Sequence, residues 1–458
     1  MARARRARHL GAALTALAAL TAAAPATAAE AEAAAPAAVA TETAVPQGHG
    51  RPAVAATPPM GWSSWSSLRR NISEPVIEAQ AKVMHDSLAR YGYRYINIDA
   101  GWTDHVDEYG RNAEDATKFP HGIAAVTRYV HGLGLKFGIY LVPGIPAAAV
   151  AADSPIKGTP YHVSDIILPG TPGNTADDGS ARIDFGKPGA DAYVRSQAEL
   201  LASWGVDYVK MDFVGPGGGR VPADNRADIQ HWQAALRATG RPIHLELSNS
   251  LSFPDAATWQ HYSNGWRIEG DIECYSHCVG LTNWDVRVKQ RFTDVPKWIP
   301  FAGPGHWNDL DSVEVGNGDA DGLTPDERQT VVTLWAAEAA PLLLGTDLTK
   351  LDPADLALLT NREVLAVDQA GRPARPLSQA TPQQVWVSKD GHGGYTVALF
   401  NLGAATATVT ADFGDLGFRG PAVVRDLWSH RNLGVERGEF SAPLAPHASR
   451  LLHVVPLG

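Results

Sequence analysis

Between residue 57 and about residue 365, the hydrophobic and polar positions repeat one unit: an amphipathic helical stretch, a glycine, and a short apolar run that ends in a polar residue. In the first copy, apolar residues recur every three or four positions from Ile77 to Leu88, which predicts a helix that Gly92 ends. The run YRYINIDAGW then predicts a buried strand. Further copies lead from AAVTRYVHGLG into LKFGIYLVPG and from AYVRSQAELLASWG into VDYVKMDF. Helices that alternate with short apolar strands predict a parallel sheet.

Five more short apolar runs raise the number of predicted strands to eight. They are MGW, IHLELS, WRIEGD, HWNDLD and PLLLG. Eight such units favour a closed (β/α)8 barrel of the TIM type over an open, doubly wound sheet. The first unit also lacks the glycine fingerprint with which open sheets bind dinucleotides. We therefore predict an α/β barrel over residues 57–365.

After about residue 365 the pattern changes to alternating, turn-punctuated segments such as QQVWVSKDGHGGYTVALFNLG and SRLLHVV, without a convincing helix. Residues 366–458 are therefore predicted to form a C-terminal antiparallel β-sandwich domain.

The first 28 residues join four arginines to the apolar stretch LGAALTALAALTAAA and then to a small-x-small site at Ala26–Ala28. This pattern predicts a signal peptide and a secreted, extracellular protein. A membrane anchor is disfavoured, because the stretch is shorter than the ~20 residues of a spanning helix. Residues 29–56 are rich in Ala, Pro, Thr and Glu and predict a flexible linker.

The net charge of the chain limits the classes of molecule that it can bind. Losing four arginines and no acids with the signal peptide takes the net charge from -10 to -14, which disfavours binding to nucleic acid or to an anionic membrane surface. The two cysteines, Cys274 and Cys278, can form a disulfide in an oxidising compartment. A zinc site is disfavoured, because CYSHC lacks a second pair of ligands.

Acids follow the predicted strands at several points, and the carboxyl ends of the strands form the active-site face of such a barrel. They are Asp99, Asp212, Glu246, Asp271, Asp309 and Asp311. Any one of them could instead cap a helix or pair with a basic side chain. As a set they predict a functional site, because two carboxylates that flank a sugar can hydrolyse its glycosidic bond, one as nucleophile and one as proton donor. That chemistry needs no cofactor.

Aromatic and basic side chains accompany these acids. Trp62, Trp65 and Trp102 could stack on a pyranose, and core packing is the alternative for each. Lys210 and Arg267 could donate hydrogen bonds to sugar hydroxyls, or could simply pair with neighbouring acids.

The motifs TPPMGW, YINIDAGW, FPHGI, GLKFGIY, DYVKMDF, WRIEGDI, WNDLD and LWAAEAAPLLL occur in the order seen in glycoside hydrolase family 27, and the chain resembles that α-galactosidase family from residue 57 onwards. The resemblance implies Asp212 as nucleophile and Asp271 as acid/base, with Arg267 four residues before it. It implies sugar contacts for Lys210, for Asp99 at the 4- and 6-hydroxyls, for Glu246 in a loop that reads the substituent at C2, and for Tyr140 and Trp65 in the pocket wall. Asp309 and Asp311 are implied to support the site rather than to react.

Three departures from the family pattern bear on the substrate. Where the family has two adjacent aspartates, this chain has Asp99 followed by Ala100, and the loops LSNSLSF and VPGIPAAAV also differ. Terminal α-D-galactosides are the first expectation. By resemblance, β-L-arabinopyranosides and α-1,6-glucans, as cleaved by isomaltodextranase, remain alternatives.

The resemblance implies retention through a glycosyl-enzyme on Asp212. Retention requires carboxyl groups ~5 to 5.5 Å apart, an ionised Asp212, to which Lys210 should contribute, and a protonated Asp271. A barrel that binds sugar without catalysis is a competing interpretation, disfavoured because both catalytic positions are aspartate. A metal-dependent hydrolase is disfavoured because the chain has no His-x-His or His-Glu-x-x-His motif.

Overall fold

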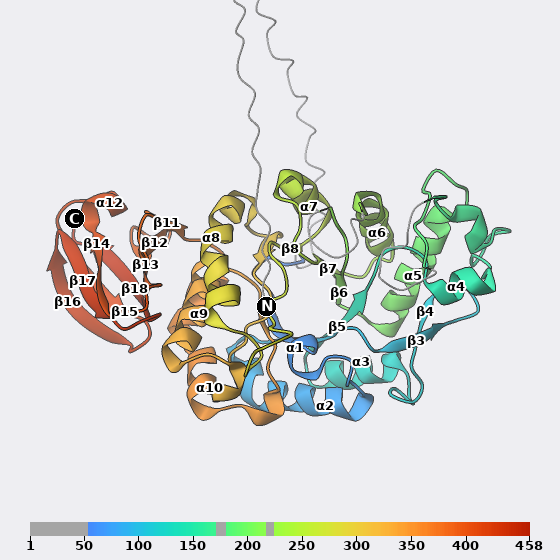
Figure 1. The fold of residues 1–458 in the computed structure, drawn as a ribbon, viewed down its shortest axis with the longest axis horizontal. Helices are drawn as coiled ribbons and strands as arrows, with labels where there is room; N and C mark the ends of the chain where they lie inside the picture. The colour runs from blue at the N-terminus through green and yellow to red at the C-terminus, as the bar shows by residue number, and fades with distance from the viewer. Residues whose placement is uncertain (1–53, 171–179, 217–223) are drawn as a thin grey trace, which may run out of the picture. The chain divides into compact units, whose positions relative to one another are not determined.

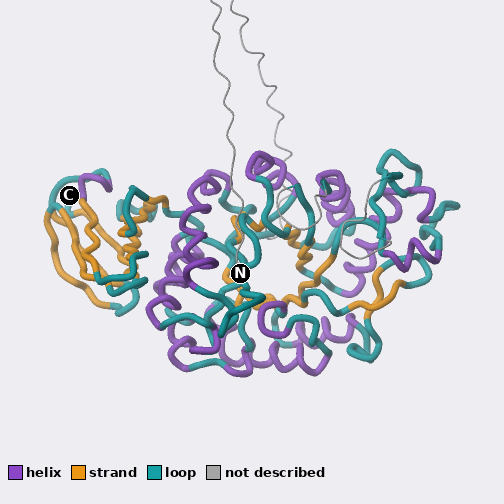
Figure 2. The backbone as a smooth tube through the Cα atoms, viewed as in Figure 1, coloured by secondary structure: helices purple, strands orange, loops and turns teal. Residues whose placement is uncertain are grey.

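The computed structural model of the protein describes residues 54–170, 180–216 and 224–458 (Figures 1 and 2). The predicted signal peptide at 1–28 and nearly all of the predicted linker at 29–56 lie outside these residues. None of the helices in the described ranges is long and apolar enough to cross a bilayer.

Eight parallel strands form one sheet in the hydrogen-bonded order β10-β1-β2-β5-β6-β7-β8-β9. Their bounds are β1 (Met60–Ser63), β2 (Tyr95–Ile98), β5 (Lys136–Leu141), β6 (Tyr208–Met211), β7 (His244–Leu247), β8 (Gly265–Arg267), β9 (Trp307–Asp309) and β10 (Leu342–Leu344). Just after β9, Val313 N donates to Leu343 O at 2.8 Å, and Gly345 N donates to Val313 O at 3.1 Å. These bonds join the two ends of the sheet, so the predicted eight-stranded barrel is confirmed.

Helices surround the strands (Figure 2). Their bounds are α1 (Trp65–Leu68), α2 (Glu74–Val83), α3 (Ile123–Gly132), α4 (Ala147–Ala152), α5 (Ala190–Trp204), α6 (Arg226–Ala238), α7 (Ala256–Tyr262), α8 (Lys289–Trp298), α9 (Pro325–Ala337), α10 (Pro353–Leu359) and α11 (Arg362–Gln369). The helix predicted around Ile77 is α2, continued by a π turn and a 3-10 turn up to Gly92. Gly92 has φ 111°, a left-handed conformation that favours glycine and ends the helix.

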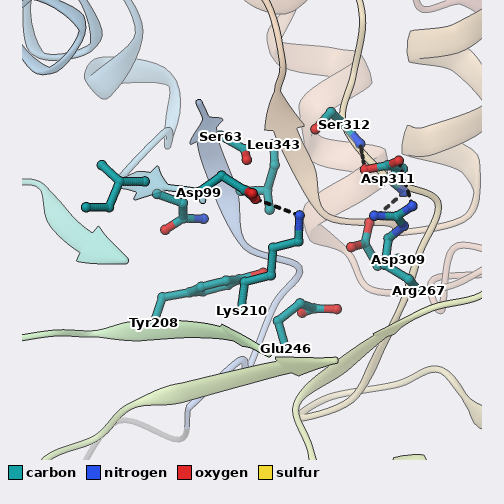
Figure 3. Close-up of a pocket in the computed structure, with 12 residues that line it drawn as sticks. Ser63, Asp99, Tyr208, Lys210, Glu246, Arg267, Asp309, Asp311, Ser312 and Leu343 are labelled. Atoms are coloured by element: carbon teal, nitrogen blue, oxygen red, sulfur yellow. Dashed lines mark hydrogen bonds and ion pairs between the residues drawn. The ribbon is translucent and has the colours of Figure 1, made fainter. Parts of the chain in front are cut away.

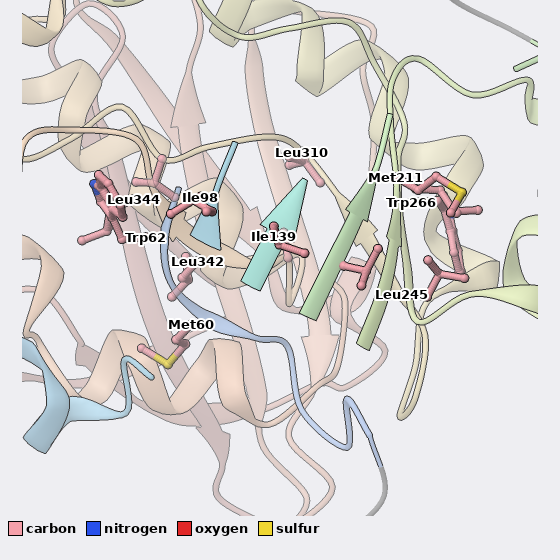
Figure 4. Packing of buried hydrophobic residues seen from close by; sticks show 14 of the residues in the cluster. Met60, Trp62, Ile98, Ile139, Met211, Leu245, Trp266, Leu310, Leu342 and Leu344 are labelled. Atoms are coloured by element: carbon pink, nitrogen blue, oxygen red, sulfur yellow. The ribbon is translucent and has the colours of Figure 1, made fainter. Parts of the chain in front are cut away.

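The strand residues that alternate with those of the pocket, among them Trp62, Met211, Leu245 and Trp266, are large and apolar and pack into one core (Figure 4). Trp62 is fully buried there, and its Nε1 donates to Thr346 O at 2.7 Å. Its face is therefore not open to a sugar, and core packing is the correct interpretation of Trp62.

A hairpin that the sequence pattern did not predict follows β2. It consists of β3 (Thr103–Val106) and β4 (Asn112–Glu114), both partly exposed and without an apolar alternation. The hairpin lies beside the active-site end of β2 and helps to shape the surface there.

The C-terminal part is the predicted antiparallel β-sandwich. One sheet has the order β11-β12-β13-β18-β15-β16 and the other pairs β14 with β17. The bounds are β11 (Arg375–Pro376), β12 (Gln383–Lys389), β13 (Tyr395–Asn401), β14 (Ala407–Asp412), β15 (Pro421–Asp426), β16 (Arg431–Arg437), β17 (Glu439–Leu444) and β18 (Ser449–Pro456), with one short helix, α12 (Phe413–Leu416). The predicted domain boundary at residue 365 lies inside α11.

The larger sheet of the sandwich packs on the barrel through α8 and α9. Phe292 of α8 contacts Phe400 and Trp386 edge-on, with ring centroids 4.9 and 5.9 Å apart. On α9, Gln329 Nε2 donates to Ser449 O at 3.0 Å. The apolar core of the barrel therefore continues into the second domain.

Candidate active site

The acids predicted from the strand ends meet in one mouth of the barrel. Asp99 follows β2, Asp212 follows β6, and Asp271 lies four residues after the end of β8, while Glu246 lies within β7 and Asp309 ends β9. Parallel strands carry these residues to the same rim because their carboxyl ends all face one way. A small pocket at this rim is shown in Figure 3, and its lining includes Ser63, Asn97, Asp99, Tyr208, Lys210, Glu246, Arg267, Asp309, Asp311 and Ser312.

Lys210 pairs with Asp99 rather than with Asp212. Its Nζ donates to Asp99 Oδ2 at 2.7 Å, as the dashed line in Figure 3 marks. Burial lowers the pKa of Lys210, but the carboxylates of Asp99 and Asp212 outweigh burial and raise it above its usual value. Lys210 is therefore a permanent cation that fixes Asp99 in the pocket.

Asp212 is held by two donors from neighbouring residues. Tyr140 OH donates to its Oδ2 at 3.2 Å, and Phe213 N donates to its Oδ1 at 2.9 Å. Burial raises the pKa of Asp212, and the opposing charge of Lys210 is too weak to reverse the shift. Lys210 thus favours the ionised form of Asp212, as expected, although desolvation is the larger effect.

Asp271 accepts a side-chain hydrogen bond on each of its two carboxyl oxygens. Arg267 donates to its Oδ1 at 2.8 Å and Tyr275 OH donates to its Oδ2 at 2.6 Å. Burial raises the pKa of Asp271, but the charge of Arg267 and the hydrogen bond from Tyr275 outweigh it, so the pKa lies below its usual value. Of the two carboxyl groups, Asp271 is therefore the one that ionises more easily.

Trp65 contacts Tyr275, which in turn contacts Asp271. Its Nε1 donates to Tyr275 OH at 2.8 Å, and the guanidinium of Arg69 lies 4.7 Å from the centre of the Tyr275 ring. The sequence pattern did not single out Tyr275, although it lies between the two cysteines in CYSHC, four residues after Asp271. Cys274 and Cys278 form the predicted disulfide, so Tyr275 belongs to a short closed loop.

Arg267 is itself fixed by Asp311. The guanidinium lies 2.9 Å from Asp311 Oδ2, which also accepts from Ile272 N at 2.8 Å, while Asp311 N donates to Asp309 Oδ1 at 2.7 Å. Asp311 has φ 78°, an unfavourable conformation for a residue other than glycine. Asp309 and Asp311 thus contact the residues around Asp271, in agreement with a supporting role.

Glu246 lies inside β7, not in the loop that follows it, which corrects the expectation from the resemblance. Its Oε2 is 2.8 Å from His244 Nε2, and both side chains are buried. Burial raises the pKa of Glu246 to about 8 and lowers that of His244 to about 3. At neutral pH the two side chains therefore form a pair in which Glu246 is largely protonated and His244 is uncharged.

Within the described residues, Asp271, Glu273 and Asp311 bring carboxylate oxygens within 4.8 Å of one another, as a metal site would. Arg267 pairs with Asp271 and Asp311 and supplies positive charge at that place. Ser66 Oγ donates to Glu273 Oε1 at 2.6 Å. The cluster is thus balanced by groups of the protein itself.

Comparisons with known proteins agree with this geometry. The family model described as α-galactosidase A matches residues 57–153 and 173–370, and that of the α-galactosidase C-terminal β-sandwich domain matches residues 380–454. An α-galactosidase from Coffea arabica is 34% identical, with 88% of this chain and 95% of that protein covered, and one from Cyamopsis tetragonoloba is 32% identical, with 88% and 87% covered.

Among solved structures, a family 27 β-L-arabinopyranosidase from Geobacillus stearothermophilus superposes with a TM-score of 0.81 at 32% identity, covering 88% of this chain and 97% of that one. α-Galactosidase I from Mortierella vinacea superposes with a TM-score of 0.70 at 28% identity, covering 88% and 97%. With its family-matching barrel, its β-sandwich and its rim of acids, the chain belongs to glycoside hydrolase family 27, the α-galactosidase family, and is an O-glycosidase.

Proposed function

We propose that the protein is a secreted, retaining glycosidase that hydrolyses terminal α-D-galactosides, with Asp212 as nucleophile and Asp271 as acid/base. One observation carries the proposal: two carboxyl groups from nearby strands of the rim, Asp212 after β6 and Asp271 after β8, are close enough that the charge of Asp271 raises the pKa of Asp212. Two carboxyl groups that flank one bond can hydrolyse it with retention or with inversion, and we propose retention from the resemblance to family 27.

In the first step, a carboxylate oxygen of Asp212 forms a bond to the anomeric carbon while the glycosidic C–O bond breaks and its oxygen takes the proton of Asp271. In the second step, water attacks the anomeric carbon, its proton passes to Asp271, and the bond to Asp212 breaks. Both side chains return to their starting states.

This mechanism needs a protonated Asp271, whereas Arg267 and Tyr275 outweigh burial and hold the pKa of Asp271 below its usual value. We attribute the protonation of Asp271 to the arrival of the substrate. Tyr275 OH occupies Asp271 Oδ2, so a leaving-group oxygen that approaches this atom displaces a donor that favours the ionised form. Without that donor, burial favours the protonated acid.

The sugar is proposed from the relatives, most of which are α-galactosidases by name. Ala100 favours a second candidate with the same mechanism, because an alanine methyl cannot accept a hydrogen bond from a sugar hydroxyl. β-L-Arabinopyranosides and α-1,6-glucans are therefore the other substrates to assay. Secretion is supported by the signal-peptide pattern at residues 1–28.

Azide distinguishes the two carboxyl groups. With 4-nitrophenyl α-D-galactoside, Asp212→Ala should release β-galactosyl azide through a single displacement, whereas Asp271→Ala should release α-galactosyl azide through the glycosyl-enzyme. Asp104→Ala, which removes an exposed acid of β3, is the control and should behave as wild type. The opposite stereochemistry in the two variants would reverse the assignment, and full activity of Asp212→Ala without azide would refute it.

A further inference from the structure

The disulfide between Cys274 and Cys278 closes a very short loop beside the catalytic pocket, since the two cysteines are four positions apart. They are the only cysteines of the chain, and both are partly exposed. A disulfide across so short a loop restricts the unfolded chain less than one across a long loop does. Its main effect in the folded protein is therefore local, because it restricts the loop itself.

The loop carries the tyrosine that contacts Asp271. Tyr275 OH donates to Asp271 Oδ2 at 2.6 Å and accepts from Trp65 Nε1 at 2.8 Å. The guanidinium of Arg69 lies 4.7 Å from the centre of the Tyr275 ring. The tyrosine is nevertheless 51% exposed. Directed contacts, rather than burial, therefore place its hydroxyl on Asp271.

The backbone of the loop has few other restraints. Its two ends are anchored, since Cys274 N donates to Leu281 O at 2.7 Å and Thr282 N donates to Asp321 O at 3.1 Å. Between these ends, residues 275–280 make no backbone–backbone hydrogen bond to any residue that the structure describes. The disulfide is therefore the covalent restraint that keeps the Tyr275 backbone close to Asp271.

The other charged groups around Asp271 lie outside the disulfide loop. They are Lys210, Asp212, Arg267, Glu273 and Asp311. Arg267, which pairs with Asp271, is fixed independently of the loop, because its guanidinium also lies 2.9 Å from Asp311 Oδ2. The second titratable side chain of the loop, His277, is exposed. Opening the disulfide should therefore change the surroundings of Asp271 through Tyr275.

We propose that the Cys274–Cys278 disulfide positions Tyr275 on the acid/base, so that the redox state of the two cysteines sets how the pocket holds Asp271. In the oxidised enzyme the tyrosine hydroxyl occupies Asp271 Oδ2, and in the reduced enzyme the loop is free to leave it. Cys274 and Cys278 are positioning residues, since they act through Tyr275. The inference rests on the proposed role of Asp271 as acid/base.

A water-soluble phosphine supplies the reduction. The phosphine attacks one sulfur and the S–S bond breaks; water then provides the oxygen of the phosphine oxide and the protons of the two thiols. Phosphorus is oxidised and the disulfide is reduced. Because the chain has no other cysteine, this is the one disulfide that the reagent can open. Without the hydrogen bond from Tyr275, burial favours the protonated form of Asp271.

The pH profile of kcat/KM on 4-nitrophenyl α-D-galactoside tests the proposal. The phosphine should move the basic limb upwards by about half a pH unit or more, because protonated Asp271 persists to higher pH. The double variant Cys274→Ser/Cys278→Ser should show the moved limb without reductant and should not respond to it. Tyr275→Phe should abolish the response. A full response in Tyr275→Phe would overturn the inference, because the effect would then bypass this residue.

His277→Asn is the matched control within the loop. His277 is exposed and has φ 62°, a conformation that asparagine tolerates. The phosphine should move the basic limb of this variant as far as that of the wild type. A response that is lost in His277→Asn and kept in Tyr275→Phe would assign the redox effect to the histidine and would overturn the inference.

A measurement without turnover separates this inference from the proposed function. In protein labelled with 3-fluorotyrosine, the fluorine NMR signal that is missing from Tyr275→Phe identifies Tyr275. Complete reduction, verified by thiol titration, should shift this signal. An unmoved signal would overturn the positioning of Tyr275 by the disulfide, even if azide identifies Asp271 as the acid/base. If the signal moved while the pH profile stayed the same, the positioning would stand and the proposed role of Asp271 would fail.

Discussion

At the scale of single residues, Asp271 is fixed through both of its carboxyl oxygens. Arg267 and Tyr275 each donate to one of its two oxygens, and Tyr275 is in turn held by Trp65. The tyrosine hydroxyl occupies the oxygen that a proton donor would present to a leaving group. Tyr275 is therefore a positioning residue that also holds down the pKa of Asp271 until substrate enters.

Tyr275→Phe should shift the pH profile of kcat/KM. Removing the hydroxyl raises the pKa of Asp271 in the free enzyme, so the protonated form persists to higher pH and the basic limb of the profile moves upwards. Profiles on one activated glycoside measure the shift. Tyr395→Phe, in β13 of the C-terminal domain, is the control, and a basic limb that moves downwards in Tyr275→Phe would contradict the assignment.

At the scale of elements, a glycine on one strand leaves room for a buried polar side chain on the neighbouring strand. A Cβ on Gly265, the first residue of β8, would overlap the carboxyl group of Glu246 on β7. Glu246 cannot swing aside at low cost, because it is buried and paired with His244. Glycine at this position therefore allows the Glu246–His244 pair to form.

Gly265→Ala should destabilise the protein by about 1–3 kcal/mol, as overpacking of a core does, and should also reduce activity by displacing Glu246. Gly132→Ala, at the end of α3, meets nothing within 4 Å and should change stability by no more than about 1 kcal/mol. Denaturant titrations of the two variants make the comparison. Equal stability of both variants would show that the space beside Glu246 is not limiting.

At the scale of the whole molecule, burial of many carboxyl groups sets the response to pH. Burial raises several pKa values to about 7 or 8; these groups are Asp228, Glu246, Glu273, Asp309 and Asp321. Each binds its proton more tightly in the folded than in the unfolded chain. The stability that this contributes is complete below the unfolded pKa near 4 and is lost as pH rises through 7 to 8.

The thermal midpoint of the protein should therefore fall between pH 5 and pH 9, by roughly 2 °C or more. Asp347 has the opposite effect on stability. Burial raises its pKa, but hydrogen bonds outweigh burial and lower the pKa to about 2. The stability that Asp347 contributes is therefore lost only as the pH falls towards 2. Calorimetry at constant ionic strength measures the trend. Asp309→Asn, which mimics the protonated side chain, should flatten it, and a midpoint that rises from pH 6 to pH 9 would contradict this account.

The sequence by itself determined the eight strands, the change to a β-sandwich and the positions of the acids at the strand ends. Apolar spacing and glycine stops depend on residues a few positions apart, and the direction of a parallel strand fixes which end its last residue reaches. Asp99, Asp212 and Asp271 could therefore be located without coordinates. The family motifs, which are also short stretches of sequence, indicated the expected roles of these three residues.

Tertiary structure alone decided how these groups act on one another. Lys210 donates a hydrogen bond to Asp99, which is 111 residues away in the sequence. Trp65 donates one to Tyr275, which is 210 residues away. The pKa of Asp271 is lowered although a protonated acid was expected, because it depends on burial and on donors that no local pattern contains. The pocket at the strand ends has the same origin, since its walls come from several strands that only the closed barrel brings together.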